Sequence, residues 1–338
     1  MKPAPARPRR LAFALPGLLC ATIVAPQEQR AAAPVESELP AAIALPGVEG
    51  RIDHLAVDLR RGRAFVAALG NGTVEVLDLE ARKPLRTLRG LEEPQGILYL
   101  ADLDRLVVGC GGTGTCEVFE GESLQKLASV RVGEDTDNLR YDAPRRQVLV
   151  AAAGILGRVD VATWTLVGIL SLAGHPESFQ LDPDGRRAFV NLPMARQVVR
   201  LDLERGAVDA TWTLEEARSN FPMALLPDDG LVIGCRAPPR LLIRSRTSGE
   251  SLQVLELAGD PDDLFHDARH DRILAVCGAG SVDVFERLEG KGWNLARQIA
   301  TAPGARTGLW IPERGRLLVA VPRRDGQQAE VRLLDLDE

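Results

Sequence analysis

The strongest constraint on this chain is an internal repeat of about 42 residues that runs through most of its length. Each copy contains a turn, a short polar segment and an apolar strand that ends on an anchor residue. The seven anchors lie 40 to 44 residues apart: Asp58, Ala101, Asp142, Asp182, Leu226, Asp267 and Ile311. Repeats of this period indicate supersecondary units that stack side by side and bury a continuous core.

Within each repeat the apolar residues follow a β-type pattern. A continuous apolar run comes after the anchor and a polar turn, as at residues 64–67 and 273–276. A third segment alternates between apolar and polar residues, as at 282–285, and a fourth leads to the next turn. Four antiparallel strands in about 42 residues are typical of a propeller blade. We therefore predict an all-β fold, a seven-bladed β-propeller.

The ends of the chain indicate how the ring closes. The seventh repeat lacks a fourth strand, because the chain stops at Glu338 soon after the apolar segment 331–334. An unassigned segment, 41–45, precedes the first blade, and we expect it to supply the missing outer strand. Such closure leaves no open strand edge. The prediction is one propeller domain at 41–338, preceded by a linker at 34–40.

Residues 1–33 have the order of a secretory signal peptide followed by the start of a linker. Basic residues, Arg9 and Arg10 among them, precede an apolar run at 11–25, and small and polar residues follow. Cys20 follows Leu19, where a lipoprotein signal carries a small residue, so we expect no lipid anchor. We expect an exported protein, periplasmic or extracellular, with no transmembrane segment after the leader.

The remaining four cysteines leave the disulfide state open. Cys110 and Cys116 flank a glycine-rich turn, where a local bridge is geometrically conceivable. Buried free thiols are the alternative for these two and for Cys235 and Cys277. No Cys-x-x-Cys pair exists, so neither a zinc ribbon nor a thioredoxin-type site is expected.

The net charge limits the classes of partner that the protein is expected to bind. The chain carries 41 Lys+Arg and 47 Asp+Glu, a net charge of −6, which gives no electrostatic basis for binding nucleic acid. We expect a monomer whose partner is a small molecule or a protein ligand.

Several stretches resemble a known repeat family. GRIDHLAVD, NLRYD, GHPESFQLD and APGARTGLWIPERGRLLVAVP are similar to repeats of the bacterial YVTN-type seven-bladed propeller family, and the resemblance covers roughly residues 41–338. The tetrad that names the family is degenerate here, since one second strand carries Phe65-Val66-Ala67-Ala68. The resemblance implies an extracytoplasmic scaffold and does not indicate a reaction.

The loops that enter the innermost strands bring polar residues of all seven blades to one mouth of the central channel, which we interpret as the functional face. The candidate ligand-binding residues are Arg51, Asp53, His54, Gln95, Asp137, Asn138, His175, Glu177, Asn220, Asp262, Asp263 and Arg306. The alternative is that these side chains only cap strand ends and bond neighbouring blades. The turns at the opposite end, with Arg145 and Arg186, read as ordinary turn residues.

Three chemistries suit such a ring. Imidazole and carboxylate groups would ligate a divalent ion (Ca, Mg, Mn or Zn), and the candidate ligands are His54, His175, Glu177 and Asp262. A carboxylate with a histidine would serve as base and acid. Arg51 and Arg306 would hold a carboxylate or phosphate. The pair His266 and His270 crosses from a strand into a turn, so we do not expect a metal site there.

Two functions remain open on this basis. The first is an exported binding module that recognises a small polar ligand, a peptide or a partner protein at the channel mouth. The alternative is a metal-dependent hydrolase or lyase, by analogy with propellers that resemble gluconolactonase and streptogramin lyase. Fold analogy alone is a weak guide to function, so the sequence leaves open whether the protein is an enzyme.

Overall fold

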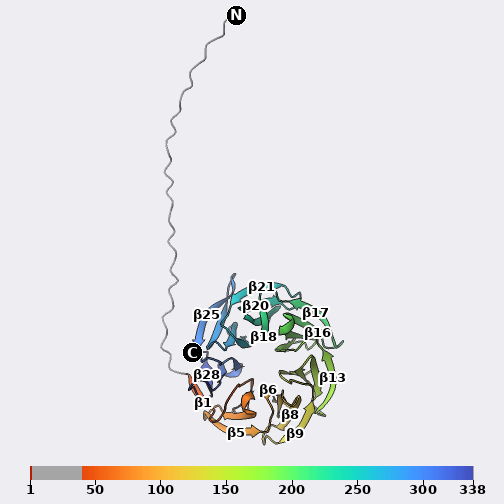
Figure 1. Cartoon of the computed structure of the whole chain (residues 1–338), viewed down its shortest axis with the longest axis vertical. Helices are drawn as coiled ribbons and strands as arrows, with labels where there is room; N and C mark the ends of the chain where they lie inside the picture. Colours follow the sequence, from red (N-terminus) through yellow and green to blue (C-terminus); the bar gives the residue numbers. More distant parts are fainter. Residues whose placement is uncertain (2–39, 338) are drawn as a thin grey trace. The chain divides into compact units, whose positions relative to one another are not determined.

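The computed structural model describes Met1 and residues 40–337 (Figure 1). Residues 40–337 form seven four-stranded antiparallel sheets arranged as blades around a central axis. The predicted all-β, seven-bladed propeller is confirmed. The expected signal peptide after Met1, Cys20 and positions 34–39 of the linker lie outside the described residues. Within the described part of the chain, no helix is long and apolar enough to span a membrane.

Blades one to three follow the repeat directly, each with its strands in chain order from the axis outward. Blade one comprises β2 (Leu55–Asp58), β3 (Arg63–Ala68), β4 (Thr73–Asp78) and β5 (Lys83–Arg89). Blade two comprises β6 (Pro94–Leu100), β7 (Arg105–Cys110), β8 (Thr115–Glu120) and β9 (Lys126–Arg131). Blade three comprises β10 (Leu139–Asp142), β11 (Gln147–Ala152), β12 (Ile155–Asp160) and β13 (Thr165–Ser171).

Blades four to six repeat the same order. Blade four comprises β14 (Phe179–Leu181), β15 (Arg187–Leu192), β16 (Gln197–Asp202) and β17 (Ala207–Thr213). Blade five comprises β18 (Arg218–Leu225), β19 (Gly230–Ala237), β20 (Pro239–Ser245) and β21 (Ser251–Glu256). Blade six comprises β22 (Pro261–Asp267), β23 (Arg272–Cys277), β24 (Ser281–Leu288) and β25 (Gly292–Ala300). Short 3-10 turns cover Leu69–Asn71, Pro193–Ala195 and Pro312–Arg314.

The seventh blade closes the ring with strands from both ends of the chain. It comprises β26 (Thr307–Ile311), β27 (Arg316–Val321), β28 (Glu330–Asp335) and the N-terminal β1 (Ala41–Ala44). β1 pairs with β28 in a register that places Ile43 opposite Val331, and the Leu45 amide donates to the Ala329 carbonyl at 2.8 Å. The predicted closure by an N-terminal strand is therefore confirmed.

The hydrophobic core lies in layers between adjacent blades. Phe65 and Val76 of blade one, for example, share a cluster with Leu106 and Val108 of blade two. The second strand of each blade is buried on both faces, which explains its continuous apolar sequence. Outer strands such as β13 are largely exposed on one face.

The four cysteines of the described chain are free and buried, so Cys110 and Cys116 form no local bridge. Their thiols pack as small apolar groups at strand ends. Burial raises the pKa of Cys110 and of Cys235 to about 12, so neither forms a reactive thiolate near neutral pH.

We expect the closing strand to carry much of the stability of the ring. Ile43 is fully buried between blades seven and one, and Ile43→Ala should cost about 2–5 kcal/mol in the free energy of unfolding. Ile169→Ala, on the exposed face of an outer strand, is the matched control and should stay within about 0.5 kcal/mol. Removing residues 41–47 should abolish cooperative melting. Full-length stability after that truncation would contradict the closure argument.

We also expect the propeller to be equally stable in oxidising and reducing conditions. After removal of residues 1–33, a thiol titration in denaturant should find four free sulfhydryl groups, because the four cysteines of the described chain are unpaired. A reductant should leave the melting temperature unchanged. Finding no reactive thiol in denaturant would show that disulfides form in the native protein.

Candidate functional site

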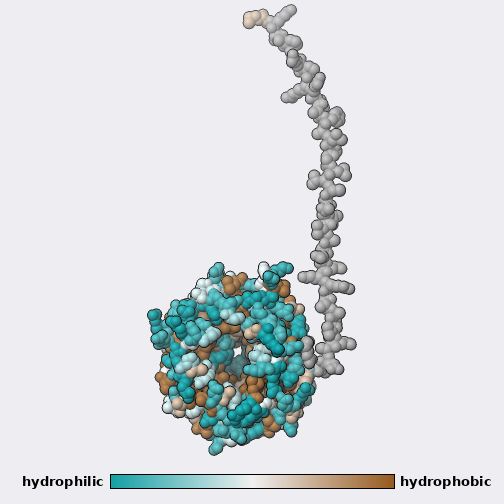
Figure 2. Space-filling view, turned by 180° about the vertical axis from the view of Figure 1, so that it is seen from behind, coloured by the Kyte–Doolittle hydropathy of each residue, from teal (hydrophilic) through white to brown (hydrophobic). Residues whose placement is uncertain are grey.

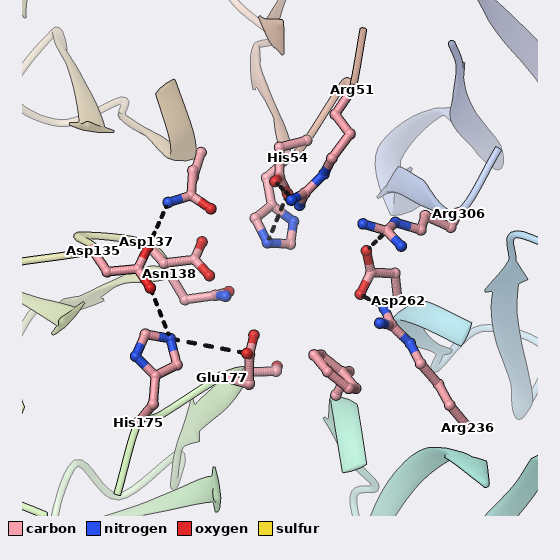
Figure 3. A pocket seen from close by; sticks show the side chains of 14 residues that line it. Arg51, His54, Asp135, Asp137, Asn138, His175, Glu177, Arg236, Asp262 and Arg306 are labelled. Atoms are coloured by element: carbon pink, nitrogen blue, oxygen red, sulfur yellow. Dashed lines mark hydrogen bonds and ion pairs between the residues drawn. The ribbon is translucent and has the colours of Figure 1, made fainter. Parts of the chain in front are cut away.

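A polar cavity of about 260 Å³ lies at the mouth of the central channel, where loops of the seven blades converge (Figure 3). Figure 2 shows that the molecule is hollowed at the centre of the ring. Ten of the twelve predicted residues line the cavity: Arg51, Asp53, His54, Gln95, Asp137, Asn138, His175, Glu177, Asp262 and Arg306. The propeller thus brings together residues up to 255 positions apart, such as Arg51 and Arg306.

The two other candidates, Asn220 and Asp263, do not line this cavity. Asn220 is fully buried, and its amide donates to Asn191 Oδ1 and to the Gln197 carbonyl, both at 2.9 Å. It therefore fixes one blade to the next, as the alternative interpretation of the ring expected. Asp263 faces a second cavity of about 400 Å³ in the channel itself and accepts a hydrogen bond from the Gly308 amide.

Four lining residues were not among the predicted set: Asp135, Ser178, Phe221 and Arg236. Asp135 and Ser178 belong to the same loops as predicted residues, so their positions in these loops were sufficient to predict them. Phe221 carries no polar group, and Arg236 lies at the end of β19, the second strand of its blade. Phe221 directly follows the candidate Asn220 near the start of the inner strand β18 but was not selected because it is apolar, whereas the pattern had no signal for Arg236.

One side of the cavity is acidic. Gln95 Nε2 donates to Asp135 Oδ1 at 3.1 Å, and His175 Nε2 lies 3.6 Å from Asp135 and 3.9 Å from Glu177 (Figure 3). Burial, followed by repulsion from Asp53, raises the pKa of Asp137 to about 7. Burial, followed by repulsion from Asp137, raises the pKa of Glu177 to about 8. His54 opposes the shift of Asp137 and Arg236 opposes that of Glu177, but neither cancels it.

The other side holds arginines that are already paired. The Arg236 and Arg306 guanidinium groups both contact the Asp262 carboxylate, with Arg306 Nε at 2.8 Å from Oδ2. Burial raises the pKa of Asp262 to about 6 even though both arginines oppose the shift. The Arg236 guanidinium also lies 3.6 Å from the centroid of the Phe221 ring, a close cation–π contact. This side is an ion-pair network across blades five, six and seven.

His54 lies between two carboxylates at the boundary of the cavity and the channel. Its Nε2 is 3.6 Å from Asp53 Oδ1, and its Nδ1 is 3.6 Å from Asp263 Oδ1. Burial opposes the charged form, but the attraction of Asp263 and Asp53 outweighs it and raises the pKa of His54 to about 10. His54 is therefore a cation at neutral pH.

Close backbone packing positions Asp137. A Cβ atom at Gly96 would lie 2.0 Å from the Asp137 carbonyl oxygen, so only glycine permits this approach. Asp135, two residues earlier, has a φ of 50°, a left-handed conformation that turns the loop into the mouth. Blade two thus supports the loop that carries the acidic side.

The four candidate metal ligands do not fit a preformed metal site. Among residues 40–337, the one group of three such side chains with ligand atoms within 4.8 Å is Asp267, His270 and Asp337, at the opposite end of the channel. At the mouth, Asp53 and Asp263 favour the protonated form of His54, so a metal ion would have to displace a proton to bind its imidazole. Asp262 is engaged by two arginines.

The cluster at the opposite end is an ion-pair network. Arg272 Nη2 donates to Asp267 Oδ2 at 2.6 Å and lies 3.4 Å from Asp337 Oδ1. His270 Nδ1 lies 2.8 Å from the same Asp267 oxygen. The guanidinium already supplies the positive charge that a metal ion would bring, and the network ties the C-terminal segment to blade six.

Interpreting Arg145 as an ordinary turn residue was wrong. Arg145 Nη1 donates to Asp142 Oδ2 at 3.0 Å and to the Gly185 carbonyl at 2.5 Å, so it joins blade three to blade four. The side chain of Arg186 is exposed, as expected of a turn residue. Arg186 is therefore the suitable control position away from the mouth.

The fold and the mouth define a seven-bladed β-propeller with a charged cavity at one end of its channel. No protein-family model and no curated protein sequence matches the chain. A chain of Kuenenia stuttgartiensis hydrazine synthase is 14% identical with a TM-score of 0.75, over 90% of this chain and 98% of that one. A chain of the U3-55K structure is 12% identical with a TM-score of 0.76, over 88% and 98%. A chain of the mitotic checkpoint complex is 15% identical with a TM-score of 0.73, over 96% and 98%. At these identities the likeness shows the fold alone.

We expect the charge of Glu177 to reduce stability as pH rises. A carboxyl group whose pKa is raised from 4.5 to about 8 on folding favours the folded state below pH 4.5 and loses that contribution as pH rises through 8. Glu177→Gln should therefore leave the melting temperature nearly unchanged at pH 5 and raise it above wild type at pH 9. Differential scanning calorimetry across this range measures the effect.

The matched control is Glu204→Gln, at an exposed carboxylate in the turn between β16 and β17. It should show no pH-dependent difference from wild type. A Glu177→Gln protein that is less stable than wild type at pH 9 would mean that the Glu177 carboxylate is compensated in the native protein.

Proposed function

We propose that this protein is an exported binding module that recognises a small polar ligand at the channel mouth and acts as a monomer. The observation that carries the proposal is the polar cavity of about 260 Å³ into which loops of different blades direct ionisable side chains. Ligand sites are concave, with a few converging polar groups. The volume favours a small molecule over a folded partner or an extended peptide.

The energetics of the mouth support a role other than stability. Asp137, Glu177 and Asp262 have raised pKa values, so their ionisation near neutral pH weakens the fold. Strongly perturbed groups gathered in a cleft are characteristic of functional sites. Asn138 and Ser178 add an amide and a hydroxyl group to the lining of the cavity, and both are able to form hydrogen bonds with a ligand.

The sequence before the propeller supports export. Residues 1–33 have the basic, apolar and small-residue order of a secretory signal, and the resemblance to YVTN-type propellers agrees with an extracytoplasmic location. Cell fractionation tests this part of the proposal. Recovery of the intact chain, residues 1–33 included, from the cytoplasm would contradict it.

We expect a ligand found by thermal-shift screening of polar metabolites to require the mouth. His175→Ala removes an imidazole that lies 3.6 Å from Asp135 and is 28% exposed, so the fold should tolerate the substitution. The variant should lower affinity by about tenfold or more in calorimetric titration, as the loss of one charge-assisted contact allows. Arg186→Ala should bind like wild type.

The choice of variant matters at this site. Arg306 bonds to Asp260 and Asp262 across two blades, so its removal would confuse binding with stability. If ligands from the screen bind His175→Ala and wild type equally, the mouth is not the binding site and the ring serves to join blades.

A further inference from the structure

The acidic side of the mouth has two carboxyl groups that no arginine or lysine of the described residues contacts. Within residues 40–337, no arginine or lysine nitrogen lies within 4.0 Å of Asp137 or Glu177, and His175 Nε2 is 3.9 Å from Glu177. The nearby arginines are used elsewhere: Arg236 and Arg306 contact Asp262. When Asp137 and Glu177 ionise, no arginine or lysine of the described residues contacts their charge, which is therefore open to a ligand.

Asp137 adds a second, independent observation. The residue is 9% exposed, and its Oδ1 atom is buried without a hydrogen-bond partner. A buried acceptor that lacks a donor is energetically unfavourable, and more so when it is charged. Its side chain points into the cavity, on the same side as Glu177 (Figure 3). A donor carried by a ligand would satisfy this atom.

We propose that the channel mouth binds a small organic cation through Asp137 and Glu177, with a primary ammonium group as the recognised feature. This inference rests on the proposed binding function of the same cavity. An ammonium group has three donors and no acceptor. Asp137, Glu177 and the amide oxygen of Asn138 supply three acceptors on one side of the cavity.

The shape of the site favours an organic cation over a bare metal ion. The ligand atoms of Asp137 and Glu177 belong to no group of three His, Cys, Asp or Glu side chains within 4.8 Å in the described residues. The cavity volume of about 260 Å³ leaves room for a carbon skeleton as well as an ammonium group. Phe221 supplies an apolar wall.

Binding of a cation here must be linked to proton release. Asp137 and Glu177 hold protons near neutral pH, because their pKa values are about 7 and 8. Their mutual repulsion and the charges of Asp53, Asp135 and Asp262 favour the protonated forms. The opposing charges are those of His54, Arg236 and Arg140, and His175 Nε2 lies 3.9 Å from Glu177. Affinity for an ammonium ligand should therefore rise between pH 6 and pH 8.5, by up to about tenfold per pH unit for each proton released.

The experiment compares three four-carbon probes that differ in their head group. Butylamine, 1-butanol and butyrate are titrated calorimetrically into the full propeller at pH 8.5, with calcium, manganese and zinc chlorides in parallel. We expect butylamine to bind and to release protons, detected as a heat that depends on the ionisation enthalpy of the buffer. Butylamine remains a cation at this pH, as a lysine side chain does with its pKa of about 10.4.

Charge-neutral variants then identify the carboxylates. Asp137→Asn and Glu177→Gln should each weaken butylamine binding by about tenfold or more and flatten its pH dependence, whereas Glu204→Gln should change neither. Melting temperatures at or above the wild-type value would show that both variants fold.

The remaining outcomes overturn the inference. Absence of butylamine binding at millimolar concentration, equal binding of butyrate or 1-butanol, or binding of a metal ion by the same two carboxylates would each exclude an organic-cation site. A neutral or anionic ligand that binds wild type and fails to bind His175→Ala would leave the proposed binding function standing while the cation inference fails.

Discussion

The pairing of β1 with β28 is the interaction on which the rest of the structure depends. It supplies the outer strand of blade seven and completes the hydrophobic layer between blades seven and one. The candidate site spans this seam, because Arg51 and His54 come from the first blade and Arg306 from the last. A ring that opened there would separate the walls of the cavity as well as expose a strand edge. Stability and site assembly therefore depend on the same four-residue strand.

Much of this architecture could be predicted from the sequence because the same strand pattern recurs in each of the seven blades. The period and the alternation of apolar residues gave the strands, and the missing fourth strand gave the closure. The channel mouth followed from topology, since the residues that start inner strands converge in any propeller. For the same reason, ten of the twelve candidate residues line one cavity.

The contacts of individual side chains could not be predicted, because they depend on the direction in which each side chain points and a repeat pattern does not encode that direction. Asn220 and Phe221 are adjacent, yet Asn220 bonds Asn191 in the interior while Phe221 faces the cavity. Arg236 reaches the mouth from a second strand because Asp262 and the Phe221 ring hold its guanidinium there. Arg145 looked like a turn residue, since its partner is a backbone carbonyl 40 residues away. Such contacts follow from packing between blades and not from spacing within one.

The two ends of the channel use the same residue types in opposite ways. At the end away from the mouth, hydrogen bonds from Arg61 and Arg63 outweigh burial and lower the pKa of Asp58, and Arg272 does the same for Asp267. These carboxylates are compensated, so their ionisation strengthens the fold at neutral pH. At the mouth, burial and mutual repulsion raise the pKa of Asp137 and Glu177 instead. The pKa of Asp262 is also raised although two arginines contact it, so the direction of the shift alone does not identify an unpaired acid. Asp137 and Glu177 differ from Asp262 because no arginine or lysine among residues 40–337 contacts them, and this difference singles out the acidic side of the mouth as the place where a ligand would complete the structure.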